Sequence, residues 1–165
     1  MISIPLDKAK LLHRAITHVE ETLQRLSSGY AAAKQATLDS PHVMKSKREV
    51  TGIEASYLAN ALAGNIQERE FWLRTLRGLR MPEAPERVAL GCVVGVGPPG
   101  GAIEGLYFIL PVCGGMEIPV DVATGVVRVI TPGTPIGKSL IGKSVGDEIE
   151  YRIGGGQPAS VRLLV

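Results

Sequence analysis

The chain lacks several features that mark common classes of protein. It holds two cysteines and only 4% aromatic residues among 165 positions. Two cysteines are too few for a disulfide framework, so we expect Cys92 and Cys113 to be reduced thiols in a core. No run of 18 apolar residues occurs, which argues against a membrane span. The segment from Met1 to Lys10 has no secretory pattern, and we expect a cytoplasmic protein without membrane contact.

The chain also lacks a large excess of charge of either sign. Lys and Arg together number 18 and Asp and Glu 16, which leaves a formal net charge of only +2. Nucleic-acid binding usually requires a concentrated basic surface, so the composition gives no general reason to expect it. The three histidines have no partner set that resembles a metal site, and we expect no cofactor and no metal ligand set.

Glycine and proline are scarce in the first half of the chain and frequent in the second. From Met81 to the end lie 16 of the 20 glycines and nine of the 11 prolines. This shift predicts a helical hairpin over residues 1–80, a linker over 81–85 and a second domain over 86–165.

The first half contains two apolar repeats with heptad spacing. Spacings that alternate between four and three residues are typical of a coiled-coil seam. Asp7 is placed to cap the first helix, and Pro41 lies where that helix should end. Two seams joined by a connector predict an antiparallel coiled-coil hairpin about 45 Å long. The seams consist of Leu12, Ile16, Val19, Leu23, Leu26, Tyr30 and Ala33, and of Ala55, Ala59, Leu62, Ile66, Arg69, Leu73 and Leu76.

The second half contains short apolar, β-branched runs separated by glycine-rich turns. These runs predict hairpin turns at Gly114-Gly115 and at Gly154-Gly155-Gly156, and one small helix over 138–142. The predicted fold class is α+β, with the helical hairpin followed by a small domain of five or six strands. The expected strands cover residues 88–96, 105–112, 117–122, 126–130, 148–153 and 160–165.

Three short motifs match catalytic or nucleotide-binding patterns without the context that these patterns need. Residues 95–101 are glycine-rich, but Pro98-Pro99 disfavours the helix that a dinucleotide site requires. Residues 137–144 match the P-loop pattern and 142–146 the nucleophile elbow, but a strand follows each of them. All three histidines also lie upstream of Ser144. We interpret residues 95–101 as a hairpin loop, and we expect neither nucleotide binding nor hydrolase activity from the other two matches.

The connector between the two helices is a candidate functional tip. Asp39, Glu49 and Glu54 supply carboxylates there, and such groups hold Mg²⁺ or its waters in many proteins. Basic residues at positions 45, 47 and 48 offset this charge. A solvated tip without a metal is therefore the alternative interpretation.

The most specific motif lies near the C-terminus. It reads Thr134-Pro135-Ile136-Gly137-Lys138-Ser139-Leu140-Ile141-Gly142-Lys143, followed by Gly146-Asp147. This segment resembles the C-terminal domain of bacterial Gre transcription elongation factors, in which a Ser-Pro-Ile/Leu-Gly-x-Ala-Leu-Ile/Leu-Gly block precedes Gly-Asp and two strands. The N-terminal hairpin is similar to the coiled coil of that family in length and order.

The resemblance implies an FKBP-like C-terminal domain and RNA polymerase as the partner. In that family the C-terminal domain docks at the rim of the polymerase secondary channel, which implies docking through Gly133, Thr134, Pro135 and Ile136. The coiled coil enters the channel, and its tip carboxylates help the polymerase to hold a second metal ion and cleave RNA. The resemblance thus implies a monomeric regulator of elongation that is not itself an enzyme and touches nucleic acid only indirectly.

The sequence departs from the family pattern at the tip. The family has an Asp-x-x-Glu-Asn-x-Glu-Tyr motif, and alignment on Tyr57 puts Val50, Ile53 and Ser56 at its acidic positions. Val and Ile cannot bind Mg²⁺ through their side chains. We therefore expect channel binding with weak or absent stimulation of transcript cleavage.

Two other functions are compatible with the sequence. An FKBP-like peptidyl-prolyl isomerase would need an aromatic pocket, for which the second half offers only Tyr107, Phe108 and Tyr151. A coiled-coil interaction module unrelated to polymerase would need an apolar stripe outside the seam. Leu11, Ala15 and Leu38 are candidates for that stripe.

Overall fold

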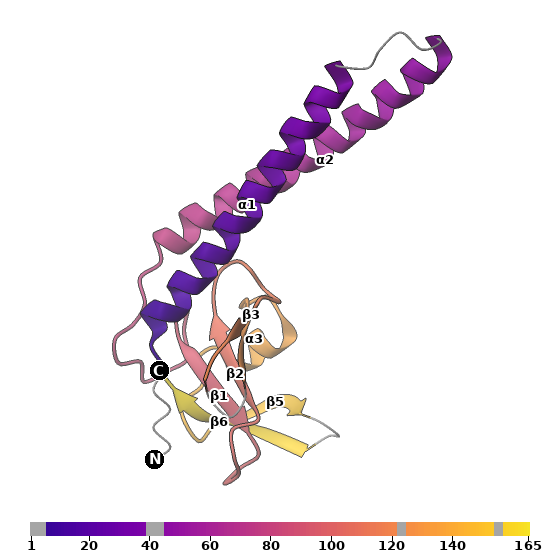
Figure 1. Cartoon of the computed structure of the whole chain (residues 1–165). Helices are drawn as coiled ribbons and strands as arrows, with labels where there is room; N and C mark the ends of the chain where they lie inside the picture. The colour runs from indigo at the N-terminus through magenta and orange to yellow at the C-terminus, as the bar shows by residue number, and fades with distance from the viewer. Residues whose placement is uncertain (1–5, 39–44, 122–124, 154–156) are drawn as a thin grey trace. The chain divides into compact units, whose positions relative to one another are not determined.

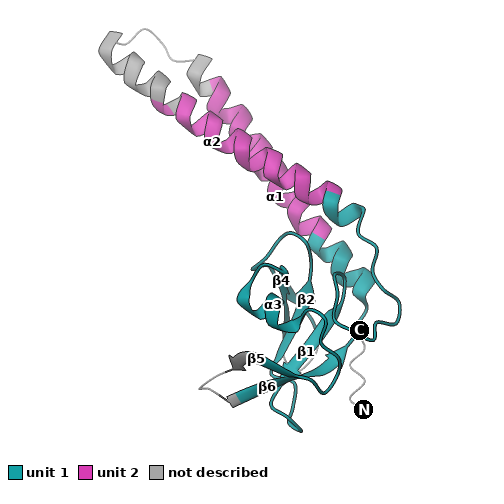
Figure 2. Cartoon of the chain, turned by 180° about the vertical axis from the view of Figure 1, so that it is seen from behind, with its two compact units in different colours: residues 1–15, 75–165 teal, residues 16–74 magenta. Residues whose placement is uncertain are grey.

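The structure is a computed structural model that describes residues 6–38, 45–121, 125–153 and 157–165. Within those ranges, the side chains of residues 36–38, 45–53, 55, 151–153 and 157 are not described. The chain divides into two compact units, Met1–Ala15 with Thr75–Val165 and Ile16–Arg74 (Figure 2). The ends of both long helices thus belong to the same unit as the sheet, whereas the predicted boundary at residue 80 follows the change in composition.

Two long helices form the first half of the chain (Figure 1). α1 spans Lys8–Leu38 and α2 spans Lys45–Arg77. The predicted cap is present, because the Lys10 amide donates to Asp7 Oδ1 at 3.1 Å. Both seams are confirmed, since every predicted seam side chain that the structure describes is buried or half-buried. Neither helix contains a stretch apolar enough to cross a bilayer, within the residues described.

The apolar stripe predicted outside the seam is wrong for the two positions that can be assessed. Leu11 and Ala15 have exposed fractions of 3% and 0%, and they belong to the unit that contains the sheet. They are core residues rather than a free surface. The side chain of Leu38 lies outside the described residues.

The second half forms a mixed sheet of six strands, which confirms the α+β class (Figure 1). The order across the sheet is β3-β4-β2-β1-β6-β5. Neighbouring strands are antiparallel except for β2 and β4. Cys92 and Cys113 are free and buried, as expected. The strands are β1 Val93–Gly97, β2 Gly105–Ile109, β3 Glu117–Pro119, β4 Val126–Ile130, β5 Glu148–Ile153 and β6 Gln157–Leu164.

Three details of the predicted second half are wrong. The first strand begins at Val93 rather than 88, because Gly91 turns the chain at a φ of +82° and the Val88 amide bonds to the Lys143 carbonyl at 2.8 Å. Gly114-Gly115 does not join a hairpin, because β4 lies between β2 and β3. The small helix α3 spans Pro135–Leu140 and so begins three residues before the predicted start at Lys138.

Two glycines should respond to the same substitution with opposite signs. Gly29 lies inside α1 with open space where a Cβ would stand, so Gly29→Ala should raise the free energy of unfolding by about 0.5–1 kcal/mol. In β1, a Cβ on Gly97 would stand 2.0 Å from the Ala102 carbonyl oxygen. Gly97→Ala should therefore lower that free energy by about 1–3 kcal/mol. Urea unfolding followed by circular dichroism measures both changes, and equal effects would contradict this assignment.

Candidate functional site

The predicted docking residues form a capped turn at the start of α3. Thr134 is the N-cap, and its hydroxyl oxygen accepts from the Gly137 amide at 3.1 Å. The same hydroxyl donates to the Thr131 carbonyl at 2.8 Å. Pro135 follows at the first helical position, where its missing N–H leaves no hydrogen bond unmade. The Thr-Pro pair thus sets the direction in which the chain enters the helix.

Gly137 holds this turn closely against the chain before it. A Cβ at Gly137 would stand 2.1 Å from the Thr131 carbonyl oxygen and 2.9 Å from Thr134 Oγ1. Any side chain would therefore force the turn open. This close approach explains why the motif needs glycine at that position, and it makes the turn a stiff element of the sheet unit.

The four predicted docking residues differ in exposure. Gly133 and Pro135 are exposed, and Thr134 is half-buried. The Ile136 side chain is 9% exposed and packs in the same core cluster as Leu140 of α3. A partner would therefore contact Gly133 and Pro135, while the buried Ile136 side chain packs the turn against the core.

An open hollow lies beside this turn, between α3 and the edge strand β5. It has a volume of about 300 Å³ and is lined by Pro135, Lys138, Ser139 and Glu150. Lys138 and Glu150 place opposite charges on its rim, and neither makes an ion pair within the described residues. Sequence reasoning missed Glu150, because only the packing of α3 on β5 brings it to the turn. The alternation of apolar and polar residues along β5 does not indicate that Glu150 lies beside this turn.

The P-loop match covers the end of α3 and the turn that follows it, and the nucleophile-elbow match lies within that turn. α3 ends at Leu140, and the amides that would cradle a phosphate are already used inside the protein. Gly142 N–H donates to the Val88 carbonyl at 2.8 Å, and Lys143 N–H donates to that of Leu140 at 3.0 Å. The Ser144 amide donates to Asp147 Oδ2 at 2.8 Å.

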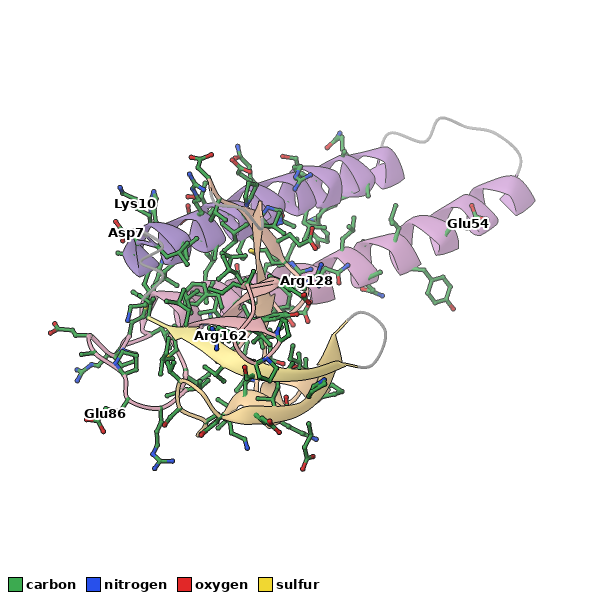
Figure 3. All side chains as sticks on the ribbon, turned by 90° about the horizontal axis from the view of Figure 1, so that it is seen from below. Asp7, Lys10, Glu54, Glu86, Arg128 and Arg162 are labelled. Atoms are coloured by element: carbon green, nitrogen blue, oxygen red, sulfur yellow. The ribbon has the colours of Figure 1, made fainter. Side chains whose placement is uncertain are left out.

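Of the three candidate tip carboxylates, Glu54 alone has a side chain that the structure describes. Glu54 is exposed on α2, toward the end of the helix that leads to the connector (Figure 3). Glu49 lies in α2 but its side chain is not described, and Asp39 lies outside the described residues. No cluster of three or more His, Cys, Asp or Glu side chains occurs among the residues that the structure covers.

Comparison with known proteins gives one informative sequence match. No family model matches the chain. The transcription elongation factor GreA of Streptomyces coelicolor is 32% identical over 92 residues, which are 54% of this chain and 52% of that protein. The chain thus spans about half the length of the curated relative it matches. This match confirms the resemblance to the Gre family.

Solved structures give low scores over longer stretches. The GreA factor homolog Gfh1 of Thermus thermophilus is 19% identical with a TM-score of 0.35, over 94% of this chain and 93% of that one. The GreA/GreB factor of Nitrosomonas europaea is 22% identical with a TM-score of 0.34, over 59% of this chain and 78% of that one. Both TM-scores lie below 0.5, so the sequence match carries the resemblance.

The hydroxyl of Thr134 should account for much of the stability of the docking turn. Thr134→Val keeps the shape of the side chain but leaves the Gly137 amide without its acceptor, and it should cost about 1 kcal/mol of unfolding free energy. Thr134→Ser keeps the hydroxyl and should stay within a few tenths of a kcal/mol of the parent protein. Chemical denaturation of all three proteins measures the difference. Equal losses for Val and Ser would show that the cap is dispensable.

Proposed function

We propose that this chain is a Gre-type transcription factor that binds RNA polymerase and regulates elongation by occupying its secondary channel. The sheet unit docks through the turn before α3, and the hairpin of α1 and α2 enters the channel. The observation that carries the proposal is the capped turn, which is formed by the same block that carries the resemblance.

The docking turn has the properties of a recognition element. It exposes Pro135 above a hollow of about 300 Å³, and its backbone is held by the Thr134 cap and the close approach of Gly137. A rigid loop loses little conformational entropy when it binds, so more of its contact energy contributes to affinity. Lys138 and Glu150 on the rim provide charge contacts that select the orientation of the partner.

The two long helices have the length that a channel probe needs. α1 has 31 residues and α2 has 33. At about 1.5 Å per residue these helices are about 45–50 Å long. Their seam residues are buried or half-buried where the structure describes them, and most of the exposed residues of both helices are polar or small. Such an element can enter a water-filled channel without exposing a continuous apolar face.

The tip does not fit the role of a metal-binding cleavage site. Val50 and Ile53 stand at acidic positions of the family motif and have no side-chain oxygen. Ser56 and Glu54 are the exposed polar residues near them that the structure describes. No step of RNA cleavage is therefore assigned to this chain, and its effect on transcription comes from occupancy of the channel and competition with cleavage-active factors.

The isomerase alternative is not favoured. None of the described residues that line the hollow beside α3 is aromatic, whereas binding of a prolyl peptide needs apolar walls. Tyr107 and Phe108 are buried in β2 rather than exposed in that hollow.

Pro135→Asp should weaken binding to RNA polymerase about tenfold or more, because it puts a charge in the middle of the docking surface. Glu104→Lys changes an exposed residue on a separate loop of the same unit and serves as the control. Fluorescence anisotropy of labelled protein with core polymerase measures both. Tight binding by Pro135→Asp would overturn the assigned docking surface, and no binding by the parent protein would overturn the proposed function.

Stimulation of cleavage should be gained when the acidic residues are restored. The parent protein should leave the RNA of stalled elongation complexes intact with Mg²⁺, while a Val50→Asp, Ile53→Glu, Ser56→Glu triple variant should shorten it. The same triple variant with Pro135→Asp is the matched control, because it has the ligands without the anchor. Rapid RNA shortening by the parent protein would contradict a channel-occupying role.

A further inference from the structure

A loop over residues 82–90 connects the end of α2 to β1, and its two ends lie close together. A Cβ at Gly91 would stand 3.0 Å from the Cα atom of Met81, at the other end of the loop. Gly91 has a φ of +82°, a conformation that disfavours any side chain. Short surface loops with adjoining ends are Ω-loops, which are frequently functional.

Hydrogen bonds join this loop to the turn that follows α3. The Val88 amide donates to the Lys143 carbonyl, and the Gly142 amide donates to the Val88 carbonyl, both at 2.8 Å. Arg87 Nη1 donates to the Gly142 carbonyl at 3.1 Å. All of these atoms belong to the sheet unit. The loop is therefore bonded to the chain directly after the helix whose first turn is the proposed docking element.

The loop also packs against α3 through one buried side chain. Val88 has an exposed fraction of 2% and belongs to the same core cluster as Ile136 and Leu140 of α3. Its neighbours Arg87 and Ala89 are exposed. Val88 thus contributes both the apolar contact with α3 and the paired backbone bonds, while Arg87 adds a bond on the solvent side.

α3 is too short to be stable without such support. It has six residues, whereas isolated helices shorter than about 12 residues are marginal in water. Its N-terminal end is held by the Thr134 cap. The helix ends before Gly142, which has a φ of +80°. Support at this second end comes from the 82–90 loop, through its bonds to Gly142 and Lys143.

The loop can hold α3 because the loop is itself fixed at both ends. At its start, the Lys8 Nζ atom of α1 donates to the Pro82 carbonyl. Just after its end, the Gly91 amide donates to the Ile109 carbonyl of β2 at 2.8 Å. The loop therefore connects α3 to the first turn of α1 and to the middle of the sheet.

We propose that the 82–90 loop is a positioning element for polymerase binding. Through Val88 and Arg87 it holds α3, and with it the docking turn, in the arrangement that the partner recognises. Neither side chain needs to contact the partner, because the affinity of a protein falls with the fraction of molecules in the competent arrangement. The effect on affinity rests on the proposed function above, whereas the effect on α3 does not.

Val88→Ala tests the proposal without altering any exposed side chain. In the isolated protein, the amides of Gly137 and Ile141 should exchange with solvent at least about tenfold faster than in the parent, because α3 loses its contact with the loop. Val129→Ala is the matched control, since Val129 is equally buried in β4 but lies outside the core cluster of α3. It should leave these two rates within about twofold of the parent.

Hydrogen exchange followed by NMR measures both amides. Equal acceleration by Val88→Ala and Val129→Ala would show that α3 opens only with the whole sheet unit, and it would overturn the proposal. Unchanged rates in Val88→Ala would overturn it as well.

Polymerase affinity gives the functional readout. Val88→Ala should weaken binding to core polymerase at least about threefold, whereas Val129→Ala should stay within about twofold although it also lowers stability. Fluorescence anisotropy of labelled protein measures both, and circular dichroism verifies that each variant is folded. Full affinity of Val88→Ala would overturn the positioning role. No binding by the parent would overturn the proposed function instead, and the exchange rates would still decide whether the loop holds α3.

Arg87 should act in the same way with a smaller effect. Arg87→Met removes the donor to the Gly142 carbonyl and should speed exchange of the α3 amides about three- to tenfold, while Arg87→Lys keeps a donor and should stay within about twofold. Arg80→Met removes the same charge from an exposed residue outside the loop and serves as the control. A greater loss of affinity in Arg87→Met than in Val88→Ala, with unchanged exchange, would make Arg87 a direct contact and refute its positioning role.

Discussion

The sheet unit depends on the burial of β1. All five of its residues are buried, and it bonds to β2 on one side and to β6 on the other. Its glycines leave room for neighbouring side chains. A Cβ at Gly95 would stand 2.9 Å from side-chain atoms of Ile103 and Leu163. Val94 and Val96 belong to the same core cluster as Ile136 and Leu140 of α3. The position of α3, and of the turn before it, follows from this strand.

The turn before α3 is packed against the core on one side and exposed to solvent on the other. Ile136 is buried, while its neighbour Pro135 faces outward. Ile136 therefore holds the turn in the core, and Pro135 is exposed for contact with a partner. The Thr134 cap and the absence of a side chain at Gly137 keep the turn closed, so the recognition element has little freedom to lose on binding. A docking surface of this kind gains its affinity from pre-organisation rather than from area.

The helical unit is organised differently, because two helices enclose very little core. Their seam residues are mostly half-buried, and Val19 and Leu73 are the buried side chains of residues 16–74 that the structure describes. A two-helix element must leave most of its surface exposed, and it can use that surface for contacts with other molecules. On α2 this surface includes the exposed side chains of Tyr57, Leu58 and Phe71.

The sequence by itself determined the local elements, because heptad spacing and runs of β-branched residues act over a few neighbouring positions. It predicted both seams, the Asp7 cap, the α+β class, and five of the six strands to within three residues at each end. It also located the block that forms the docking turn. The tip acids Asp39 and Glu49 stay predictions from sequence, and Glu54 is placed only as an exposed residue of α2.

Only the tertiary structure decided which elements meet. β3 pairs with β4 rather than with β2, although Gly114-Gly115 suggested a hairpin, because pairing depends on partners far along the chain. Glu150 joins Pro135 and Lys138 around one hollow only because α3 packs on β5. Burial of Leu11, Ala15 and Ile136 was likewise set by contacts that no local pattern contains. Periodicity says which side of an element is apolar, and long-range packing decides what covers that side.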